Sequence, residues 1–301
     1  MLHSVPAIYK HGLGENLMRN VARASVLAIT CVAVAVIITV SGQQPDTLNI
    51  RPVKEGLYLI NGTGGNVGVR ITSDGVILID NKFPRNFEAI QERVREVTSE
   101  PVKYVINTHH HGDHAGGNVE YIKIAEVIAH QNARDNMIKN EQGGPPRIVF
   151  TKETAIHLGD TEVRAYHFGQ GHTDGDSIVY FPDLQTIHGG DLLHGTAPFI
   201  DYANGGSSRD WITTLDGALD LDFDTAIPGH GQLMTKADVR AFRDQFVSVR
   251  QHMTELIRSG VTKDTVATQI PTNELSWTMA SDGLFMRRSL PGFYDEVAAE
   301  R

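Results

Sequence analysis

The stretch "NTHHHGDHAGGN", residues 107–118, places four histidines and one aspartate within six positions. Such a density of imidazole and carboxylate suits either a solvated polar turn or a metal site. The stretch follows "VKYVIN", residues 102–107, which reads as a buried strand, and "GVILID", residues 75–80, reads as an earlier one. Between them, the apolar residues of 86–97 repeat at helical spacing. Strand, helix and strand predict a parallel crossover, with the histidines at the end of its second strand.

The spacing of the histidines indicates how their side chains point. In a helix, His109 and His111 would project about 200° apart and could not share a metal ion. In an extended chain, residues two apart project to the same side, and His110 faces away. Gly112 then permits a sharp turn, which lets Asp113 and His114 aim at a neighbouring point. Two pairs of ligands at two points predict two metal ions.

Two metal ions need further ligands, and three later residues are candidates. His172, Asp191 and His230 each follow an apolar strand and have glycine beside them. Asp80, at the end of residues 75–80, is the candidate carboxylate that orients a ligating imidazole, because such imidazoles need a partner for their other N–H. The only cysteine, Cys31, lies in an N-terminal segment that we expect to be removed, so the ligands are nitrogen and oxygen atoms.

The ordered set of seven residues resembles the metallo-β-lactamase superfamily. His109, His111, Asp113 and His114 match its H-x-H-x-D-H signature, and His172, Asp191 and His230 match the later ligand positions in order. The resemblance runs from "NGTGGNVGV" to "IPGHG". It implies an α/β fold, an αββα sandwich of two mixed β-sheets flanked by helices. The strand and helix pattern independently suggests two sheets covered by helices in one domain.

The resemblance also implies how the ligands are divided between the metal ions. His109, His111 and His172 would hold the first ion; Asp113, His114 and His230 would hold the second, with Asp191 bridging the two or binding mainly the second. The implied cofactors are two Zn²⁺ ions, although iron and manganese also suit nitrogen and oxygen ligands. A hydroxide between the ions would attack a carbonyl carbon, and Asp113 would orient that hydroxide as the catalytic carboxylate.

The implied function is a zinc-dependent hydrolase of a small-molecule ester, thioester, lactone or lactam. One alternative is a class B-type β-lactamase. However, Asp191 stands where the best-known periplasmic β-lactamases have cysteine, and His194 stands where they have a substrate-binding lysine. A further alternative is a non-catalytic periplasmic metal-binding protein.

Two segments are expected to contact substrate. Residues 61–66, "NGTGGN", are expected to form a mobile hairpin over the site, and residues 199–207 are expected to form a second wall. The candidate substrate contacts are Asn66, His194, Phe199, Tyr202 and Asn204.

The ends and the composition of the chain indicate its organisation and location. Residues 1–42 contain "RNVAR", an apolar run at 26–40 and small residues after it, which is typical of a secretory signal peptide. If that segment is retained, it would be an N-terminal membrane anchor. Residues 43–301 then form a single catalytic domain, periplasmic or secreted. The net charge of −9 argues against nucleic acid as a partner, and the oligomeric state is not determined by the sequence.

Overall fold

The computed structural model describes Met1 and residues 47–195, 198–270 and 285–300. Contacts divide the chain into two units, Met1–Pro45 and Asp46–Arg301, and the second unit contains both β-sheets and all seven candidate ligands. The expected signal segment lies outside the described residues, apart from Met1. Within the described ranges, no helix has both the length and the apolar character needed to cross a membrane.

Two mixed β-sheets form the centre of the fold. The first sheet follows chain order, with its first four strands antiparallel and β4 to β7 parallel: β1 (Asn49–Lys54), β2 (Leu57–Asn61), β3 (Val67–Thr72), β4 (Gly75–Ile79), β5 (Val102–Ile106), β6 (Glu126–His130) and β7 (Ile148–Phe150). The second sheet has the order β13-β12-β11-β10-β9-β8: β8 (Glu153–Leu158), β9 (Thr161–Tyr166), β10 (Ile178–Phe181), β11 (Thr186–His194), β12 (Thr225–His230) and β13 (Met234–Thr235). Only the pairing of β11 with β12 is parallel in this described sheet.

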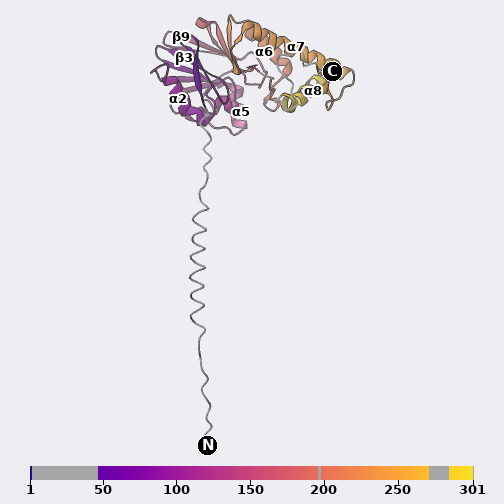
Figure 1. The fold of residues 1–301 in the computed structure, drawn as a ribbon, viewed down its shortest axis with the longest axis horizontal. Coiled ribbons are helices and arrows are strands. Elements are labelled where there is room, and N and C mark those ends of the chain that lie inside the picture. Colours follow the sequence, from indigo (N-terminus) through magenta and orange to yellow (C-terminus); the bar gives the residue numbers. More distant parts are fainter. Residues whose placement is uncertain (2–46, 196–197, 271–284, 301) are drawn as a thin grey trace, which may run out of the picture. The chain divides into compact units, whose positions relative to one another are not determined.

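Helices cover both outer faces of the pair of sheets. The described α-helices are α2 (Phe87–Arg95), α3 (Gly112–Ala115), α4 (Asn118–Tyr121), α5 (Gln131–Lys139), α6 (Ser208–Leu219), α7 (Lys236–Arg258) and α8 (Leu290–Ala299). Figure 1 shows α2 and α5 on one side of the strands and α6 and α7 on the other. The predicted αββα sandwich is therefore confirmed, as is the parallel crossover from β4 through α2 to β5.

The strand β4 shows how the sequence builds this sandwich. Ile77 and Ile79 belong to the apolar cluster between the two sheets, whereas Val76 and Leu78 belong to the cluster under α2. Alternate side chains of a strand project to opposite faces, and all four are fully buried. A strand covered on both faces needs an unbroken apolar run, which "GVILI" provides.

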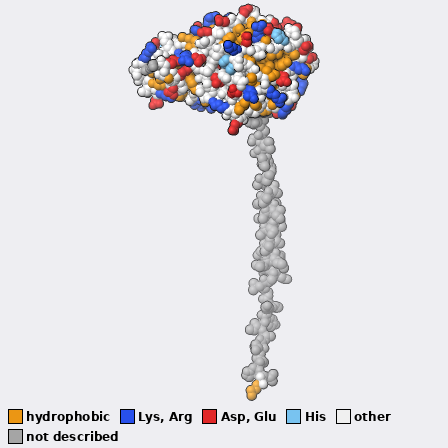
Figure 2. Space-filling view, turned by 180° about the vertical axis from the view of Figure 1, so that it is seen from behind, with side chains coloured by type: hydrophobic (Ala, Val, Ile, Leu, Met, Phe, Trp, Pro, Cys, Tyr) orange, Lys and Arg blue, Asp and Glu red, His pale blue; other side chains and the backbone are white. Residues whose placement is uncertain are grey.

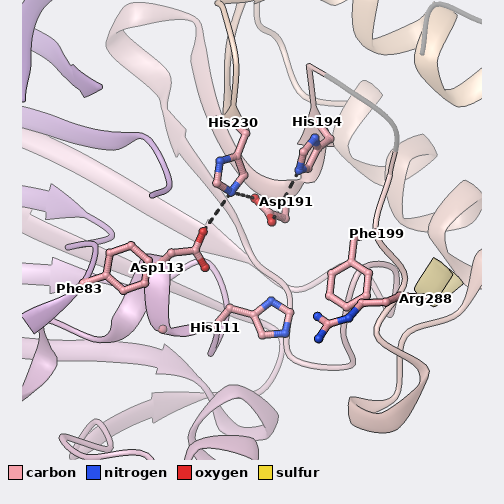
Figure 3. A pocket seen from close by; sticks show the side chains of 9 residues that line it. Phe83, His111, Asp113, Asp191, His194, Phe199, His230 and Arg288 are labelled. Carbon is pink, nitrogen blue, oxygen red and sulfur yellow. Dashed lines mark ion pairs between the residues drawn. The ribbon is translucent and has the colours of Figure 1, made fainter. Parts of the chain in front are cut away.

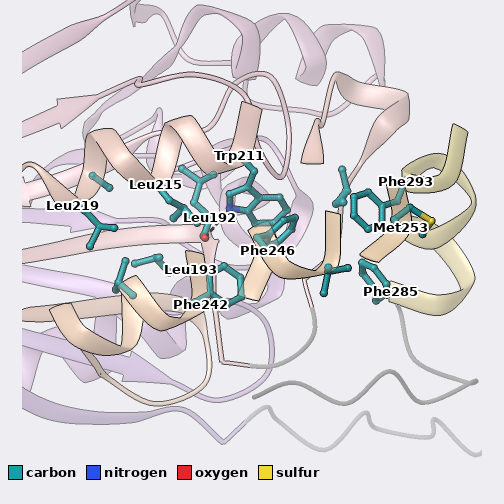
Figure 4. Close-up of a cluster of buried hydrophobic side chains, with 14 of the residues drawn as sticks. Leu192, Leu193, Trp211, Leu215, Leu219, Phe242, Phe246, Met253, Phe285 and Phe293 are labelled. Atoms are coloured by element: carbon teal, nitrogen blue, oxygen red, sulfur yellow. Dashed lines mark hydrogen bonds between the residues drawn. The ribbon is translucent and has the colours of Figure 1, made fainter. Parts of the chain in front are cut away.

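A third apolar cluster joins the second sheet to the C-terminal helices. Trp211 of α6 packs against Phe246 of α7 with ring centroids 4.8 Å apart, as Figure 4 shows. The indole Nε1 of Trp211 also donates a hydrogen bond to the carbonyl of Leu192 at 3.1 Å. Because Leu192 follows Asp191 on β11, this packing holds the strand that carries one candidate ligand.

The last helix, α8, forms hydrogen bonds with the wall of residues 199–207 and with the start of α6. Glu296 of α8 accepts hydrogen bonds from the hydroxyl of Ser207 at 2.7 Å and from the backbone N–H of Ser208 at 3.0 Å. The hydroxyl of Tyr202 donates to the same carboxylate at 2.9 Å. These bonds satisfy donors at the start of α6 and attach the C-terminal region to the part of the chain that borders the candidate site.

Candidate metal centre

The histidine stretch begins after β5, as expected, and its first pair of candidate ligands meets His172. The rings of His109 and His111 have centroids 4.9 Å apart. His111 Nδ1 faces His172 Nε2 at 2.8 Å. One potential ligand atom from each of the three residues lies within 4.8 Å of the others. The loop after β5 and the loop before β10 thus meet at one point.

A second group lies beside the first. His230 Nε2 lies 3.2 Å from Asp113 Oδ2 and 3.2 Å from His114 Nε2. Asp191 lies between the groups, with Oδ1 3.2 Å from His114 Nε2 and Oδ2 3.7 Å from His172 Nε2. The structure therefore brings all seven candidate ligands together, from the turn after β5, from α3, from the loop before β10, from within β11 and from the end of β12.

The turn between the two pairs differs from the expectation for Gly112. Gly112 is the first residue of α3, its φ is not positive, and a Cβ at this position would meet no atom within 4 Å. The reversal comes from the start of α3 after the extended His111, which any residue could support. The glycine is therefore not needed for the turn, and the expectation that rested on its conformational freedom was wrong.

Asp80 lies where the sequence suggested, behind a candidate ligand. Its carboxylate accepts hydrogen bonds from His114 Nδ1, the backbone N–H of Thr108 and the Thr108 hydroxyl, each at 2.8 Å. Both Asp80 and His114 are fully buried. Because Nδ1 donates to Asp80, Nε2 is the ring atom of His114 that faces Asp191 and His230, and a metal ion would bind it in place of a proton.

Two outer partners were missed by the sequence analysis. His111 Nε2 donates to Asp201 at 2.9 Å, and His172 Nδ1 donates to the carbonyl of Phe199 at 2.6 Å. His109 Nδ1 has a partner as well, the hydroxyl of Thr108 at 3.1 Å. For Asp201 and the carbonyl of Phe199, the sequence offered only the expectation that residues 199–207 form a wall of the site. That expectation does not identify a carboxylate or a carbonyl as a partner of histidine.

Burial keeps part of the centre in the form that binds metal ions. Desolvation, with the nearby His114 and His172, holds the pKa of His109 well below its usual value. Desolvation and the neighbouring His111 lower the pKa of His172 to about 3. Both imidazoles are therefore neutral at neutral pH and each offers a lone pair. His109 Nε2 is buried with no hydrogen-bond partner among the described residues, which fits an atom that binds a metal ion.

The acidic residues of the centre attract positive charge. Burial alone would lower the pKa of His114, but the carboxylates of Asp191 and Asp80 outweigh it and raise this pKa well above its usual value. Burial alone would raise the pKa of Asp191, but His114 outweighs it and holds this pKa well below its usual value. A proton on His114 thus supplies the positive charge that a bound cation would supply. The donor set fits a divalent metal ion.

Comparison with known proteins agrees with this geometry. The sequence model of the metallo-beta-lactamase superfamily matches residues 60–230 of this chain. This chain belongs to the metallo-β-lactamase superfamily. As a member of that superfamily, it is a metal-dependent hydrolase.

Individual relatives are distant. A metallo-beta-lactamase type 2 of Elizabethkingia meningoseptica is 25% identical over 185 residues, which cover 58% of this chain and 74% of the relative. A solved metallo-beta-lactamase from Pontibacter korlensis has a TM-score of 0.60 at 18% identity, covering 67% of this chain and 99% of that one. A solved variant of the sec-alkyl sulfatase PisA1 has a TM-score of 0.68 at 15% identity, covering 84% of this chain and 50% of that one. The two solved structures show the shared fold alone.

A pocket of about 620 Å³ opens onto the centre of this superfamily member. Figure 3 shows Phe83 beside Asp113 on one side, Phe199 and Arg288 on the other, and His230, Asp191 and His194 above. Of the expected substrate contacts, His194 and Phe199 line this pocket. Tyr202 lines an adjoining one, and Asn204 instead donates a hydrogen bond to Asp201 at 2.6 Å.

Asn66 and its glycine-rich segment have a different place from the one expected. Asn66 is buried and donates through Nδ2 to the carbonyls of Pro228 and Gly231, at 2.9 and 3.1 Å, so it does not line the pocket. The segment is held to the centre by hydrogen bonds from the backbone N–H groups of Gly65 to Asp113 and of Asn66 to Gly229. These bonds attach the segment to α3 and to β12, both of which carry candidate ligands, and this is not the arrangement of a free hairpin.

Proposed function

We propose that this hydrolase binds two zinc ions and cleaves an ester, thioester, lactone or lactam. The observation that carries the proposal is the convergence of seven side chains on one open pocket. In His109, His111, His114 and His172, the ring nitrogen that faces away from the centre is hydrogen-bonded, which leaves the other nitrogen for a metal ion. His109, His111 and His172 would hold one ion; Asp113, His114 and His230 would hold the other, with Asp191 between. Zinc ions there would lower the pKa of water to about 7 and polarise a carbonyl group.

Asp113 has the position of a carboxylate that orients the attacking water. It lines the pocket and its Oδ2 lies 3.2 Å from His230 Nε2. Burial would raise the pKa of Asp113, but the hydrogen bond with His230 and the nearby His114 outweigh it and lower the pKa to about 2. The carboxylate therefore stays ionised at neutral pH and accepts a hydrogen bond from water. The open pocket favours catalysis over metal storage, because storage and structural sites are closed by protein ligands.

The test is metal analysis together with a panel of substrates. We expect the purified chain to hold about two zinc equivalents, and chelation to abolish hydrolysis that zinc restores. The panel comprises an aryl ester, a thioester, a lactone and nitrocefin, a chromogenic β-lactam. Turnover of nitrocefin alone would identify a β-lactamase, the function that the curated relatives' names favour.

A matched pair of histidine variants separates metal binding from general loss of histidine. His172→Ala should lose zinc and hydrolysis, whereas His157→Ala, at an exposed position of β8, should keep both. A folded protein that takes up zinc and hydrolyses none of the panel would favour the non-catalytic metal-binding alternative. A folded protein that binds no metal ion at all would overturn the dinuclear site.

The finer statement of location is also a proposal. We infer that residues 1–42 direct export and that the catalytic domain acts in the periplasm or outside the cell, from the basic start and the apolar run at 26–40. N-terminal sequencing of the protein recovered from cells should then begin near residue 43. A membrane-bound protein that keeps its N-terminus would support an anchor instead.

A further inference from the structure

Arg288 lines the pocket of the metal centre although it lies far along the chain from the candidate ligands. It belongs to η5 (Phe285–Ser289), just before α8. It is the only lysine or arginine among the residues that line this described pocket, and it lines the adjoining pocket as well. The superfamily match ends at residue 230, so the matched segment does not include this arginine.

The position of Arg288 is tied to the metal centre through its neighbours. The candidate ligand His172 donates to the carbonyl of Phe199 at 2.6 Å. The next residue, Ile200, donates its backbone N–H to the hydroxyl of Ser289 at 2.8 Å. Ile200 and Ser289 are both buried. These two hydrogen bonds, the second of them buried, thus place Arg288, which precedes Ser289, beside the wall that contacts the centre.

The guanidinium of Arg288 is oriented by an aromatic ring and keeps its charge. It lies 5.6 Å from the ring centroid of Phe199, and that ring stacks on His111 with a centroid distance of 5.8 Å. In Figure 3 the guanidinium extends past Phe199 toward His111. A ring face orients a guanidinium without neutralising it. No carboxylate of the described residues forms an ion pair with it.

The two sides of the pocket carry opposite charges. Asp113 and Asp191 line one side, with Arg288 across from them. Even where bound metal ions neutralise these carboxylates, the guanidinium remains a fixed cation with a flat, forked set of donors. Such a fork binds a carboxylate through two parallel hydrogen bonds. A substrate that carries a carboxylate would therefore be oriented in one way.

We propose that Arg288, held over Phe199, is a specificity-determining residue that binds a carboxylate of the substrate while the scissile carbonyl lies at the metal centre. This substrate class rests on the proposed hydrolytic function. The preferred substrates are acids in which the ester, thioester or lactam bond lies a few atoms from a free carboxylate. Neutral esters of the same leaving group are the poorer substrates.

A pair of substrates with one leaving group tests the proposal on the zinc-loaded full chain. Phenyl acetate is neutral, and phenyl hydrogen succinate carries the carboxylate. In Arg288→Ala we expect KM for the succinate ester to rise by about ten- to hundred-fold, the range for a lost hydrogen-bonded charge pair. The kcat for that ester and both constants for phenyl acetate should stay close to wild type. Arg288→Lys should recover part of the loss, because it keeps the charge but not the fork.

Arg287 provides the matched control. It is an exposed neighbour of the same charge that lines neither pocket. Arg287→Ala should leave the preference for the succinate ester intact. If Arg288→Ala changed both substrates equally, or Arg287→Ala did the same as Arg288→Ala, the carboxylate site would be overturned.

A binding experiment keeps this proposal separate from the proposed function. Calorimetric titration with N-benzylsuccinamate, an amide analogue that carries the carboxylate, needs no turnover. Binding by wild type and Arg287→Ala, weakened in Arg288→Ala, supports the carboxylate site even if neither these esters nor any substrate of the panel is hydrolysed, in which case the hydrolytic proposal fails. Equal binding by all three proteins, or binding by none, overturns the carboxylate site.

Discussion

His111 donates a hydrogen bond to Asp201 from one ring nitrogen and faces His172 with the other. Nε2 lies 2.9 Å from Asp201 Oδ2, and Nδ1 lies 2.8 Å from His172 Nε2. Asn204 donates to the same oxygen of Asp201 at 2.6 Å. The carboxylate thereby fixes both the ring orientation and the tautomer of His111, so that the lone pair of Nδ1 points into the centre.

Removing this carboxylate should weaken the first metal-binding group. Without Asp201, the ring of His111 can rotate and its inner nitrogen can carry the proton. We expect Asp201→Ala to lower the zinc affinity of this group by about ten- to hundred-fold, measured by competition with a chromophoric chelator. Asp135→Ala, which removes an exposed carboxylate of α5, is the control. An unchanged zinc affinity in Asp201→Ala would contradict the role given to Asp201.

The second group should respond to Asp80 in the same way. Asp80 has a φ of 63°, a conformation that asparagine tolerates better than most residues. Asp80→Asn therefore keeps the backbone but removes the charge that holds His114 Nδ1–H. We expect the second zinc equivalent to bind about ten- to hundred-fold more weakly, with the first less affected. If Asp80→Asn and Asp201→Ala weakened the same zinc equivalent, the division into two groups would be wrong.

Gly65 and Gly112 should differ sharply when each is replaced by alanine. A Cβ at Gly65 would lie 2.2 Å from the ring of His114, whereas one at Gly112 would meet nothing within 4 Å. Because His114 is fully buried, its ring cannot move aside freely. We expect Gly65→Ala to lower the free energy of unfolding by about 1–3 kcal/mol and to weaken zinc binding. Gly112→Ala should unfold like wild type in the same denaturant titration, and equal effects would contradict this explanation.

The stability should fall in mild acid partly through His130. Desolvation and the stacked ring of His167 lower the pKa of His130 to about 4, below the usual 6.5. A pKa lowered by folding gives stability that is complete above about pH 6.5 and is lost as the pH falls toward 4. In denaturant titrations, His130→Asn should flatten this part of the pH dependence, because asparagine keeps a cap for α5 but does not titrate. An identical slope in both proteins would exclude His130 as the cause.

Local patterns in the sequence predicted most of the fold and two residues of each candidate metal-binding group. The two-residue period of extended chain placed His109 with His111, and the apolar run of residues 75–80 predicted both β4 and the position of Asp80. The sandwich followed from the order of strands and helices and from the resemblance to the superfamily. The first two inferences succeeded because they depend only on backbone geometry over a few residues. The pattern of apolar and polar side chains indicates that geometry directly.

The remaining parts of the site were decided by tertiary structure. Asp201 lies 90 residues from His111 in the sequence and is its hydrogen-bond partner. Phe199 accepts a hydrogen bond from His172 through its backbone carbonyl, which any residue at position 199 would offer. Arg288, near the C-terminal end of the chain, is held beside the site by the hydrogen bond between Ile200 and Ser289. Asn66 and Gly112 have other roles than their sequence neighbours suggested. Periodicity indicates which face of an element is buried but not which distant element covers it. The candidate ligands could therefore be predicted from the sequence, whereas the residues that orient them and shape the pocket could not.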